Sequence, residues 1–309
     1  MNGIPLQSSS RDWFRVDGRR SGEIRTENAG AFRRVFYRHG IASSSSLKRK
    51  RILFFSDLHI RPQTAGCFPR KMYWKGTDEI QRFLLETIEK YLPDHLFFGG
   101  DMMAYACNFP ECLKLFRSLH CTGLKIGVCG NWDRMRPWLP SRDWHKALES
   151  AGLRLLVNEE CYDGDMRIFG LDDIRKGSPE YFPPEKPVGF GCVLAHNPDV
   201  IPEALSTEML RGIDLILCGH THGGQIRIPG FGALMCSSRY WKKFEYGLYE
   251  NRYTGTRLLV SAGLGVTFIR RRIFCPPEAV IIDLASDPAK RPDRPENTFP
   301  ASFLERPAG

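Results

Sequence analysis

The chain has 309 residues, of which 42% are apolar and 26% are charged. Such a length can bury a sizeable core, and the composition excludes a wholly disordered, collagen-like or coiled-coil protein. The formal net charge is +9, and residues 1–51 carry most of it, with 12 basic and 4 acidic residues against 32 and 31 in the remainder. A nearly neutral body disfavours a general nucleic-acid-binding protein, whose basic footprint lies on the folded face.

The order of apolar runs along the chain indicates where strands and helices lie. Residues 1–50 are expected to form a partly ordered basic arm, with a short strand near residues 31–37. The apolar run at 52–55 predicts a buried strand, and apolar residues at helical spacing predict a helix over 78–92, which Pro93 ends. Further strands are expected within 95–101 and 124–133, further helices over 111–119 and 141–151, and later strands near residues 166, 190, 213, 256 and 278.

Strands and helices alternate in the first half of the sequence, and strands dominate in the second. This order predicts an α/β sandwich built on two mixed sheets, with the folded domain spanning residues 51–285. Five prolines fall within residues 286–309, which are therefore expected to form a flexible tail.

Cysteine usage and targeting signals bear on the compartment. None of the ten cysteines lies in a CxxC motif, and several lie in apolar runs, which favours reduced structural thiols. No stretch approaches the roughly 20 apolar residues of a membrane span, and the N-terminus lacks the apolar core of a secretory signal. The Arg- and Ser-rich N-terminus has the composition of a mitochondrial presequence but no clear helical stripe. We expect a cytoplasmic protein, with peripheral attachment to the inner face of the membrane as an alternative.

Polar residues of metal-binding type follow five of the expected strands. Ligands of α/β proteins gather at the carboxyl ends of strands, and two side chains at i and i+2 can point towards one site. Taken singly, each motif is compatible with chance, but their ordered occurrence after apolar runs predicts one shared site. The motifs are Asp57-Leu58-His59, Gly99-Gly100-Asp101, Gly130-Asn131-Trp132-Asp133, His196-Asn197-Pro198 and Gly219-His220-Thr221-His222.

The donor types in these motifs indicate which ions they suit. A mixture of carboxylate, amide and imidazole suits two borderline divalent cations, such as Mn, Fe, Zn or Co, better than Ca or a thiolate-bound zinc. Two such ions about 3.5–4 Å apart would activate water and clamp a phosphoryl group. We expect Mn, Fe or Zn, with Mn favoured. The remaining histidines are expected to be structural or surface residues; they are His39, His95, His120 and His145.

The motifs DLH, GGD, GNWD, HNP and GHTHGGQI resemble those of the calcineurin-like metallophosphoesterase family, over about residues 50–285. The resemblance implies a four-layer αββα sandwich of two mixed sheets flanked by helices. It also implies that one ion is held by Asp57, His59 and His222, that the other is held by Asn131, His196 and His220, and that Asp101 bridges them. The longer runs GHTHGGQIRIPGFG, VSAGLG and CPPEAVIIDL are similar to a branch that contains bacterial phosphodiesterases and a UDP-2,3-diacylglucosamine pyrophosphatase of the lipid A pathway.

One position departs from the family pattern. The family usually has histidine after the asparagine, where it assists the leaving oxygen, and this chain has Trp132. Indole N–H can donate a hydrogen bond but cannot transfer a proton at neutral pH. Loss of a general acid matters least for a good leaving group, so Trp132 favours pyrophosphates or activated diesters. The alternative is that Asp133, Arg134 or His145 takes the role.

Two basic and aromatic segments bear on the partner. The arm of residues 1–50 is compatible with a solubilising tail, with nucleic-acid binding or with attachment to an anionic membrane, and its interleaved aromatic residues suit a lipid interface. These are Trp13, Phe14, Phe32, Phe36 and Tyr37. The segment 237–249 is compatible with a rim near the metals or with ordinary strand packing.

These observations predict a dinuclear metal-dependent phosphoester or pyrophosphate hydrolase. Asn131, Trp132 and Asp133 are the expected catalytic positions, and Arg134 and Arg227 are expected to contact substrate phosphate. The leading substrate is a lipid-linked nucleotide such as UDP-2,3-diacylglucosamine, and a general phosphodiester is the alternative. A non-catalytic scaffold of the same fold would have eroded ligands, and a nuclease is disfavoured by the neutral body. No nucleic acid and no obligate protein partner are expected.

Overall fold

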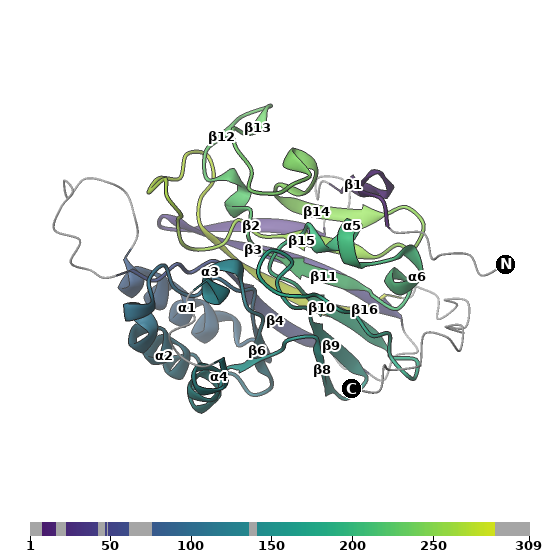
Figure 1. Cartoon of the computed structure of the whole chain (residues 1–309), viewed down its shortest axis with the longest axis horizontal. Helices are drawn as coiled ribbons and strands as arrows, with labels where there is room; N and C mark the ends of the chain where they lie inside the picture. Colours follow the sequence, from purple (N-terminus) through teal and green to yellow (C-terminus); the bar gives the residue numbers. More distant parts are fainter. Residues whose placement is uncertain are drawn as a thin grey trace.

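The computed structural model describes residues 8–16, 23–42, 47, 49–61, 76–135 and 141–287. Two seven-stranded mixed sheets form its centre (Figure 1). In order across the first sheet, the strands are β2 (Ile24–Ala29), β3 (Phe32–Ala42), β16 (Glu278–Asp287), β4 (Lys50–Phe55), β5 (His95–Phe98), β6 (Lys125–Gly127) and β7 (Arg154–Leu155). In order across the second, they are β1 (Trp13–Arg15), β14 (Gly247–Asn251), β15 (Arg257–Val260), β11 (Leu215–Cys218), β10 (Phe190–Leu194), β9 (Met166–Gly170) and β8 (Glu159–Asp163).

Helices and a small hairpin complete the described fold. The α-helices are α1 (Thr77–Tyr91), α2 (Phe109–Ser118), α3 (Asn131–Arg134), α4 (Ser141–Ser150), α5 (Val200–Ala204) and α6 (Thr207–Leu210). The 3-10 helices are η1 (Ser10–Asp12), η2 (Ala106–Asn108), η3 (His222–Gly224) and η4 (Trp241–Phe244). The hairpin strands, β12 (Arg227–Ile228) and β13 (Gly232–Ala233), pair only with each other and project beyond the sheets (Figure 1). Most of the expected tail, residues 286–309, lies outside the described residues.

The strands divide their side chains between layers, because successive residues of a strand point to opposite faces of a sheet. On β4, Leu53 and Phe55 lie in the core that the first sheet shares with α1, α2 and α4, whereas Phe54 lies in the core between the two sheets. On β11, Leu217 faces this central core and Ile216 faces the outer core beside α5 and α6. The layers are therefore helix, sheet, sheet and helix, as the family resemblance implied.

Helix α1 illustrates how closely the local sequence sets an element. Its buried face carries Ile80, Phe83 and Leu84 at helical spacing, acidic residues lie in its first turn and Lys90 lies in its last, which suits the helix dipole. Leu92 takes a left-handed conformation as the C-cap, and Pro93 follows. The helix begins and ends within a residue of the range expected from the sequence.

Within residues 8–16 and 23–42, more of the chain is built into the sheets than the sequence indicated. The strand β3 is longer than the short strand expected near residues 31–37, and it pairs with β16 in parallel from Arg33 opposite Glu278 to Ala42 opposite Asp287. It also pairs with β2, while β1 joins the other sheet beside β14. Arginines interrupt the apolar pattern of β3, so the sequence predicted only a short strand there. Arg34 is buried and its guanidinium is paired with Glu27.

The same contacts account for much of the basic charge near the N-terminus. Several of these cations form ion pairs with carboxylates of the later chain, so their charge is neutralised within the fold. The pairs are Arg15 with Glu245 at 3.9 Å, Arg33 with Glu278 at 2.5 Å, Lys50 with Asp163 at 2.8 Å and Arg51 with Asp283 at 2.6 Å. The sequence therefore divides into a basic N-terminal segment and a nearly neutral remainder, but in the folded molecule part of the basic charge is paired with carboxylates of that remainder.

Candidate metal centre

The five motifs meet where the two sheets present the carboxyl ends of their parallel strands. Asp57 and His59 follow β4, Asp101 follows β5, and Asn131 opens α3 after β6. His196 follows β10, and the His220–His222 segment follows β11 in the other sheet. Backbone bonds join the loops within each sheet: Asp57 N–H donates to Gly100 O at 2.9 Å, and Gly219 N–H donates to His196 O at 3.0 Å. The sheet topology therefore gathers the predicted ligands at one edge.

Two glycines, each directly before a candidate ligand in the sequence, allow the loops to come together. A Cβ on Gly130 would lie 2.1 Å from Asp101 Oδ1, and a Cβ on Gly219 would lie 2.3 Å from Asp57 Oδ2. No side chain fits at such distances, so glycine is required for the loops to approach the two carboxylates.

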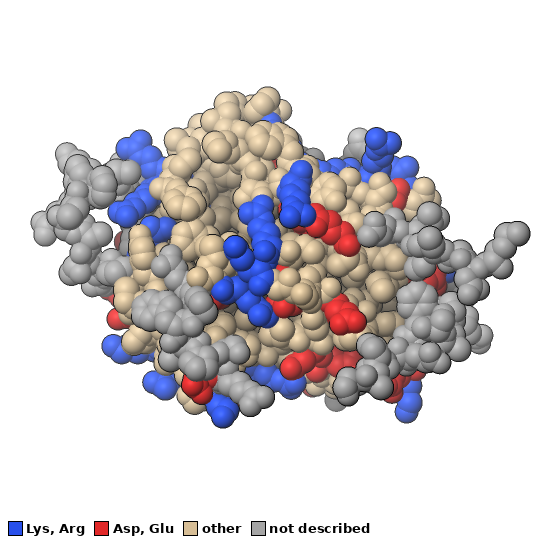
Figure 2. Space-filling view, in the orientation of Figure 1, with Lys and Arg blue, Asp and Glu red and all other residues tan. Residues whose placement is uncertain are grey.

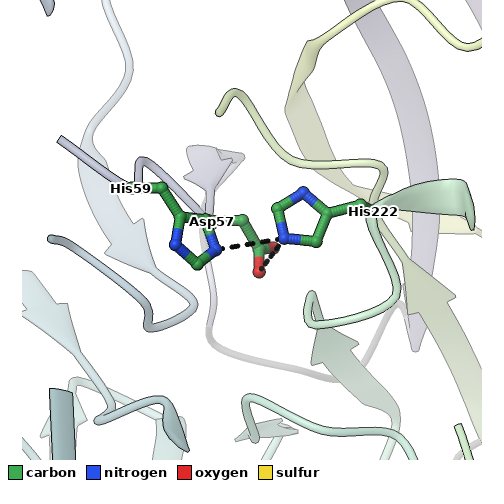
Figure 3. A group of neighbouring side chains, drawn as sticks. All are labelled: Asp57, His59 and His222. Carbon is green, nitrogen blue, oxygen red and sulfur yellow. Dashed lines mark hydrogen bonds and ion pairs between the residues drawn. The ribbon is translucent and has the colours of Figure 1, made fainter. Parts of the chain in front are cut away.

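The candidate ligands fall into two groups of buried side chains. The first group is Asp57, His59 and His222, and the second contains Asp101, His196 and His220. Figure 3 shows the first group, in which the rings of His59 and His222 turn a nitrogen towards each other beside the Asp57 carboxylate. The two Nε2 atoms are 3.1 Å apart. In the second group, His220 Nδ1 is 3.1 Å from His196 Nε2.

Asp101, a member of the second group, also reaches the first. Its Oδ2 is 3.4 Å from His59 Nε2 and 3.2 Å from His196 Nε2, so one carboxylate oxygen touches a member of each group. Asn131 joins the second group, because its Oδ1 is 3.2 Å from His196 Nε2. The structure thus brings together all seven residues expected to bind metal.

Burial and the neighbouring charges set the protonation of these groups. Burial lowers the pKa of His59 to about 4 and lowers the pKa values of His220 and His222 well below their ordinary value, so these rings are neutral at pH 7. Burial and the neighbouring Asp101 charge raise the pKa of Asp57 to about 6. Burial disfavours the His196 cation, but the nearby carboxylates, Asp101 above all, outweigh it and raise the pKa of His196 to about 10.

The residues present fit a pair of divalent cations. Imidazole nitrogens converge in pairs 3.1 Å apart, two buried carboxylates face the same space, and among the described residues the buried His220 Nε2 has no hydrogen-bond partner. This mixed nitrogen and oxygen set suits Mn, Fe or Zn, and neutral imidazole is the form that coordinates them.

Contacts behind the ligands hold them in place. Ser56 Oγ donates to Asp57 Oδ2 at 2.6 Å, and His220 N–H donates to both Asp57 oxygens at 3.1 Å. The Arg272 guanidinium donates to Ala262 O and Gly265 O, and one of its nitrogens lies 3.3 Å from His222 Nδ1. Neither Ser56 nor Arg272 was predicted from the sequence. A serine before DLH and an arginine in an RRR run carry no spacing signal.

Asp133 has a structural role in the described fold. Its carboxylate accepts backbone N–H bonds from Asp101 at 2.8 Å, Met102 at 3.0 Å and Gly130 at 2.9 Å. These bonds tie the loop after β5 to the loop after β6. Burial and the Asp101 charge raise the pKa of Asp133 to about 7.

Trp132 lies over the first group rather than away from it. Its backbone N–H donates to Asp101 Oδ1 at 2.9 Å, and its ring packs edge-on against His59 with centroids 5.2 Å apart. Its other neighbour is Phe268, at a centroid distance of 5.5 Å. An indole therefore occupies the position next to the candidate metal ligands where the family pattern has imidazole.

The two arginines expected to contact phosphate lie in different places. Arg134, in α3 beside the ligands, is paired with Asp172. Arg227 is paired with Glu245 at 2.7 Å and donates to Gly223 O at 2.9 Å. His145 lies on α4, where its Nε2 is 3.9 Å from Cys129 Sγ.

Comparison with known proteins decides the family. Residues 50–224 match the family described as Calcineurin-like phosphoesterase. The chain belongs to this family. The Bacillus subtilis metallophosphoesterase YkuE is 30% identical over 250 residues, which is 76% of this chain and 79% of YkuE. The Escherichia coli phosphodiesterase YaeI is 28% identical over 254 residues, which is 77% of this chain and 87% of YaeI.

Among solved structures, the 5'-nucleotidase precursor of Thermus thermophilus has a TM-score of 0.43 and 15% identity, and the match covers 83% of this chain and 58% of that one. Family membership and the two candidate ligand groups make this protein a metal-dependent phosphoester hydrolase. Within the described residues, no helix combines the length and the apolar character needed to cross a bilayer.

Proposed function

We propose that the protein hydrolyses a phosphodiester or pyrophosphate bond that has a good leaving group, with a lipid-linked nucleotide such as UDP-2,3-diacylglucosamine as the leading substrate. The position of Trp132, edge-on to His59 where an imidazole would serve as proton donor, carries this proposal. A leaving phosphate monoester needs little help from an acid, unlike an alkoxide. The phosphodiesterase YaeI, which is 28% identical, favours a general phosphodiester as the second candidate.

The candidate ligands define what the chain contributes to the reaction. When bound, two divalent cations would supply Lewis-acid polarisation and an activated water. Asp57, His59 and His222 would hold one, Asn131, His196 and His220 the other, and Asp101 both. We propose Mn as the favoured ion. Asn131 and the Trp132 indole N–H are the proposed hydrogen-bonding groups of the site, and Arg134, beside the ligands on α3, is the better placed of the two arginines to contact phosphate.

The experiment compares hydrolysis of aryl and alkyl phosphodiesters by wild type and Trp132→His. General acid catalysis typically contributes 10²–10⁴-fold, so wild type should depend steeply on leaving-group pKa and Trp132→His should depend on it less. Trp144→His, on α4, is the matched control and should behave like wild type. An unchanged dependence in Trp132→His would contradict the assigned role of Trp132.

A substrate panel tests the lipid-linked proposal separately. UDP-2,3-diacylglucosamine, a cyclic nucleotide and a bis-aryl phosphate would each be offered to the manganese-loaded enzyme. Preference for UDP-2,3-diacylglucosamine supports the leading substrate, and preference for the diesters supports a general phosphodiesterase. No turnover of any of the three compounds would contradict both proposed substrate classes.

We also propose an anionic membrane as a partner. The sequence suggested that residues 1–50 would make this contact, but four cations near the N-terminus are engaged in ion pairs with the later chain. These pairs reduce the positive charge that the segment can offer to lipid. Another face of the molecule is therefore the better candidate for the membrane contact.

A further inference from the structure

Exposed apolar side chains are concentrated in two loops of the described structure. Of the 16 large hydrophobic residues that are exposed, half lie in residues 228–235 and 266–274. They include Phe268, Phe274, Met235 and Phe231, which are 85%, 73%, 67% and 60% exposed. The other four are Ile228, Leu234, Ile269 and Ile273. Apolar clusters of this kind on a protein surface mark an interaction site.

The two loops form one surface, which we call the apolar face and define as these eight residues. Ile226 and Ile273 form a β-bridge, and Arg227 N–H donates to Ile273 O at 2.9 Å. Phe231 and Phe274 line the same cavity of about 370 Å³. In Figure 1 the β12–β13 part of this face projects at the top of the molecule. The two loops are therefore joined, and the β12–β13 part of the face stands away from the sheets.

The charge around the apolar face is predominantly positive. The segments 225–244 and 265–275 contain seven arginines and lysines and no aspartate or glutamate. Two of these cations are paired with carboxylates outside the segments, Arg227 with Glu245 and Arg239 with Glu203, and the others leave an excess of positive charge. Lys242 lies over the Phe231 ring, 3.1 Å from its centroid, and Arg271 is exposed within the second loop. In Figure 2 the projecting region is largely tan and Lys and Arg side chains gather below it. A second copy of this face would meet like charges, whereas an anionic surface would meet opposite ones.

The face is also anchored to the metal centre. Arg61, two residues after His59, donates to Val266 O and Thr267 O at 3.0 Å. At the other end of the second loop, Arg272 approaches His222. Phe268 packs on Trp132, which packs on His59. A surface held by the apolar face would therefore lie next to the candidate ligands.

We propose that the apolar face docks on an anionic lipid bilayer, with its phenylalanines in the interface and the flanking cations at the headgroups. Aromatic and aliphatic side chains bordered by Lys and Arg are the residue types that bind such interfaces. This docking rests on the membrane contact proposed above and is independent of the proposed substrate, since it requires only the surface of the folded protein.

The test is co-sedimentation of the full chain with vesicles of phosphatidylcholine alone or mixed with phosphatidylglycerol. Wild type should bind the mixed vesicles, and added salt should weaken binding. Phe231→Ser with Phe274→Ser should abolish most of the bound fraction. Tyr253→Ser, at a residue that is 67% exposed between β14 and β15, is the matched control and should bind like wild type.

A second pair of variants tests the charge. Arg271→Gln should weaken binding to the mixed vesicles about fivefold, since one Lys or Arg near an anionic surface contributes about that factor. Lys114→Gln, at an exposed lysine on α2, should not change it. All variants should retain the wild-type melting transition and hydrolyse a soluble aryl phosphodiester at the wild-type rate, which separates docking from catalysis.

Either of two results would overturn the proposal. Wild type would fail to bind the mixed vesicles, or the Phe231 and Phe274 double variant would bind as well as Tyr253→Ser. Equal binding to both vesicle types would overturn the part assigned to the cations. Capture of a protein by this face with no vesicle binding would identify an acidic protein partner instead.

Discussion

At the scale of single residues, Asp133 shows how a carboxylate beside a metal centre can act through the backbone. Asp133→Asn should lower metal affinity about 10–100-fold, the usual effect of disturbing groups behind metal ligands. An amide has one acceptor oxygen, so at least one of the three N–H donors loses its partner, which costs about 1–3 kcal/mol. Metal titration calorimetry and chemical denaturation measure the two effects. Asp143→Asn, exposed on α4, is the control, and equal metal affinity in both variants would contradict this role.

The crowding of ionisable groups also predicts how the protein responds to metal removal. Asp57 and Asp101 are buried beside each other's charge, and three neutral imidazoles face the same space. A bound cation offsets the repulsion between these two buried carboxylates, and it does so only in the native state. A free metal concentration 100 times its Kd should therefore stabilise the fold by about 2.7 kcal/mol. Differential scanning calorimetry with and without a chelator checks this, and identical melting temperatures would contradict it.

The candidate site was largely predictable because its motifs are local. Asp57 and His59, or His220 and His222, are recognisable within one strand-end turn, and the sheet topology brings such turns together. The residues behind them were not predictable. Ser56, Arg61 and Arg272 act through backbone or side-chain contacts that only the folded chain creates.

At the scale of secondary-structure elements, β2, β3 and α1 are tied together by Glu27. Its carboxylate accepts from Tyr91 Oη at 2.6 Å and pairs with Lys90 and Arg34 at 3.0 Å. The hydrogen bond from Tyr91, followed by that from Lys90, lowers the pKa of Glu27 from 4.5 to about 2. The folded state thus favours the ionised carboxylate.

This shift sets a direction for acid stability. Glu27 stabilises the fold fully above pH 4.5, and this contribution is lost as the pH falls towards 2. Glu27→Gln should therefore lower the melting temperature at pH 6 and lower it progressively less as the pH approaches 3. Glu86→Gln, which removes an exposed carboxylate 3.7 Å from Arg34, is the control. A Glu27→Gln deficit that does not shrink with acidification would contradict the assignment.

The strands show where sequence patterns succeed and where they fail. Runs such as 52–55 and 215–217 are apolar without interruption because both faces of those strands are buried, and they were predicted. The strand β3 lies between β2 and β16, but Arg33 and Arg34 interrupt its apolar residues, and their partners Glu278 and Glu27 are not adjacent to them in the sequence. Paired charges can therefore hide a buried strand.

At the scale of the whole molecule, the N-terminal strands should be indispensable. A chain that begins at residue 43 lacks β1, β2 and β3, and it exposes the edge of β16 along its full length. We expect this variant to lose cooperative thermal unfolding and to aggregate, because an unpaired edge strand binds other chains. Circular dichroism melts and gel filtration would measure this. A cooperative melt like that of the full chain would show that the strands are dispensable.

The left-handed backbone at the ligands has a consequence for the whole fold. Asp57, His59, Asp101, His220 and His222 all have positive φ, from 43° to 68°, which non-glycine residues adopt at a cost of about 1–2 kcal/mol each. For the stability of the folded state alone, glycine would be the favoured residue at these positions, whereas catalysis requires carboxylates and imidazoles. In a chelator, His59→Gly should therefore melt at a higher temperature than His59→Ala, although neither should hydrolyse substrate. If this protein were selected for thermal stability alone, these positions would accordingly be expected to change to glycine, and the protein would lose its activity. The enzyme persists only while its turnover is itself under selection.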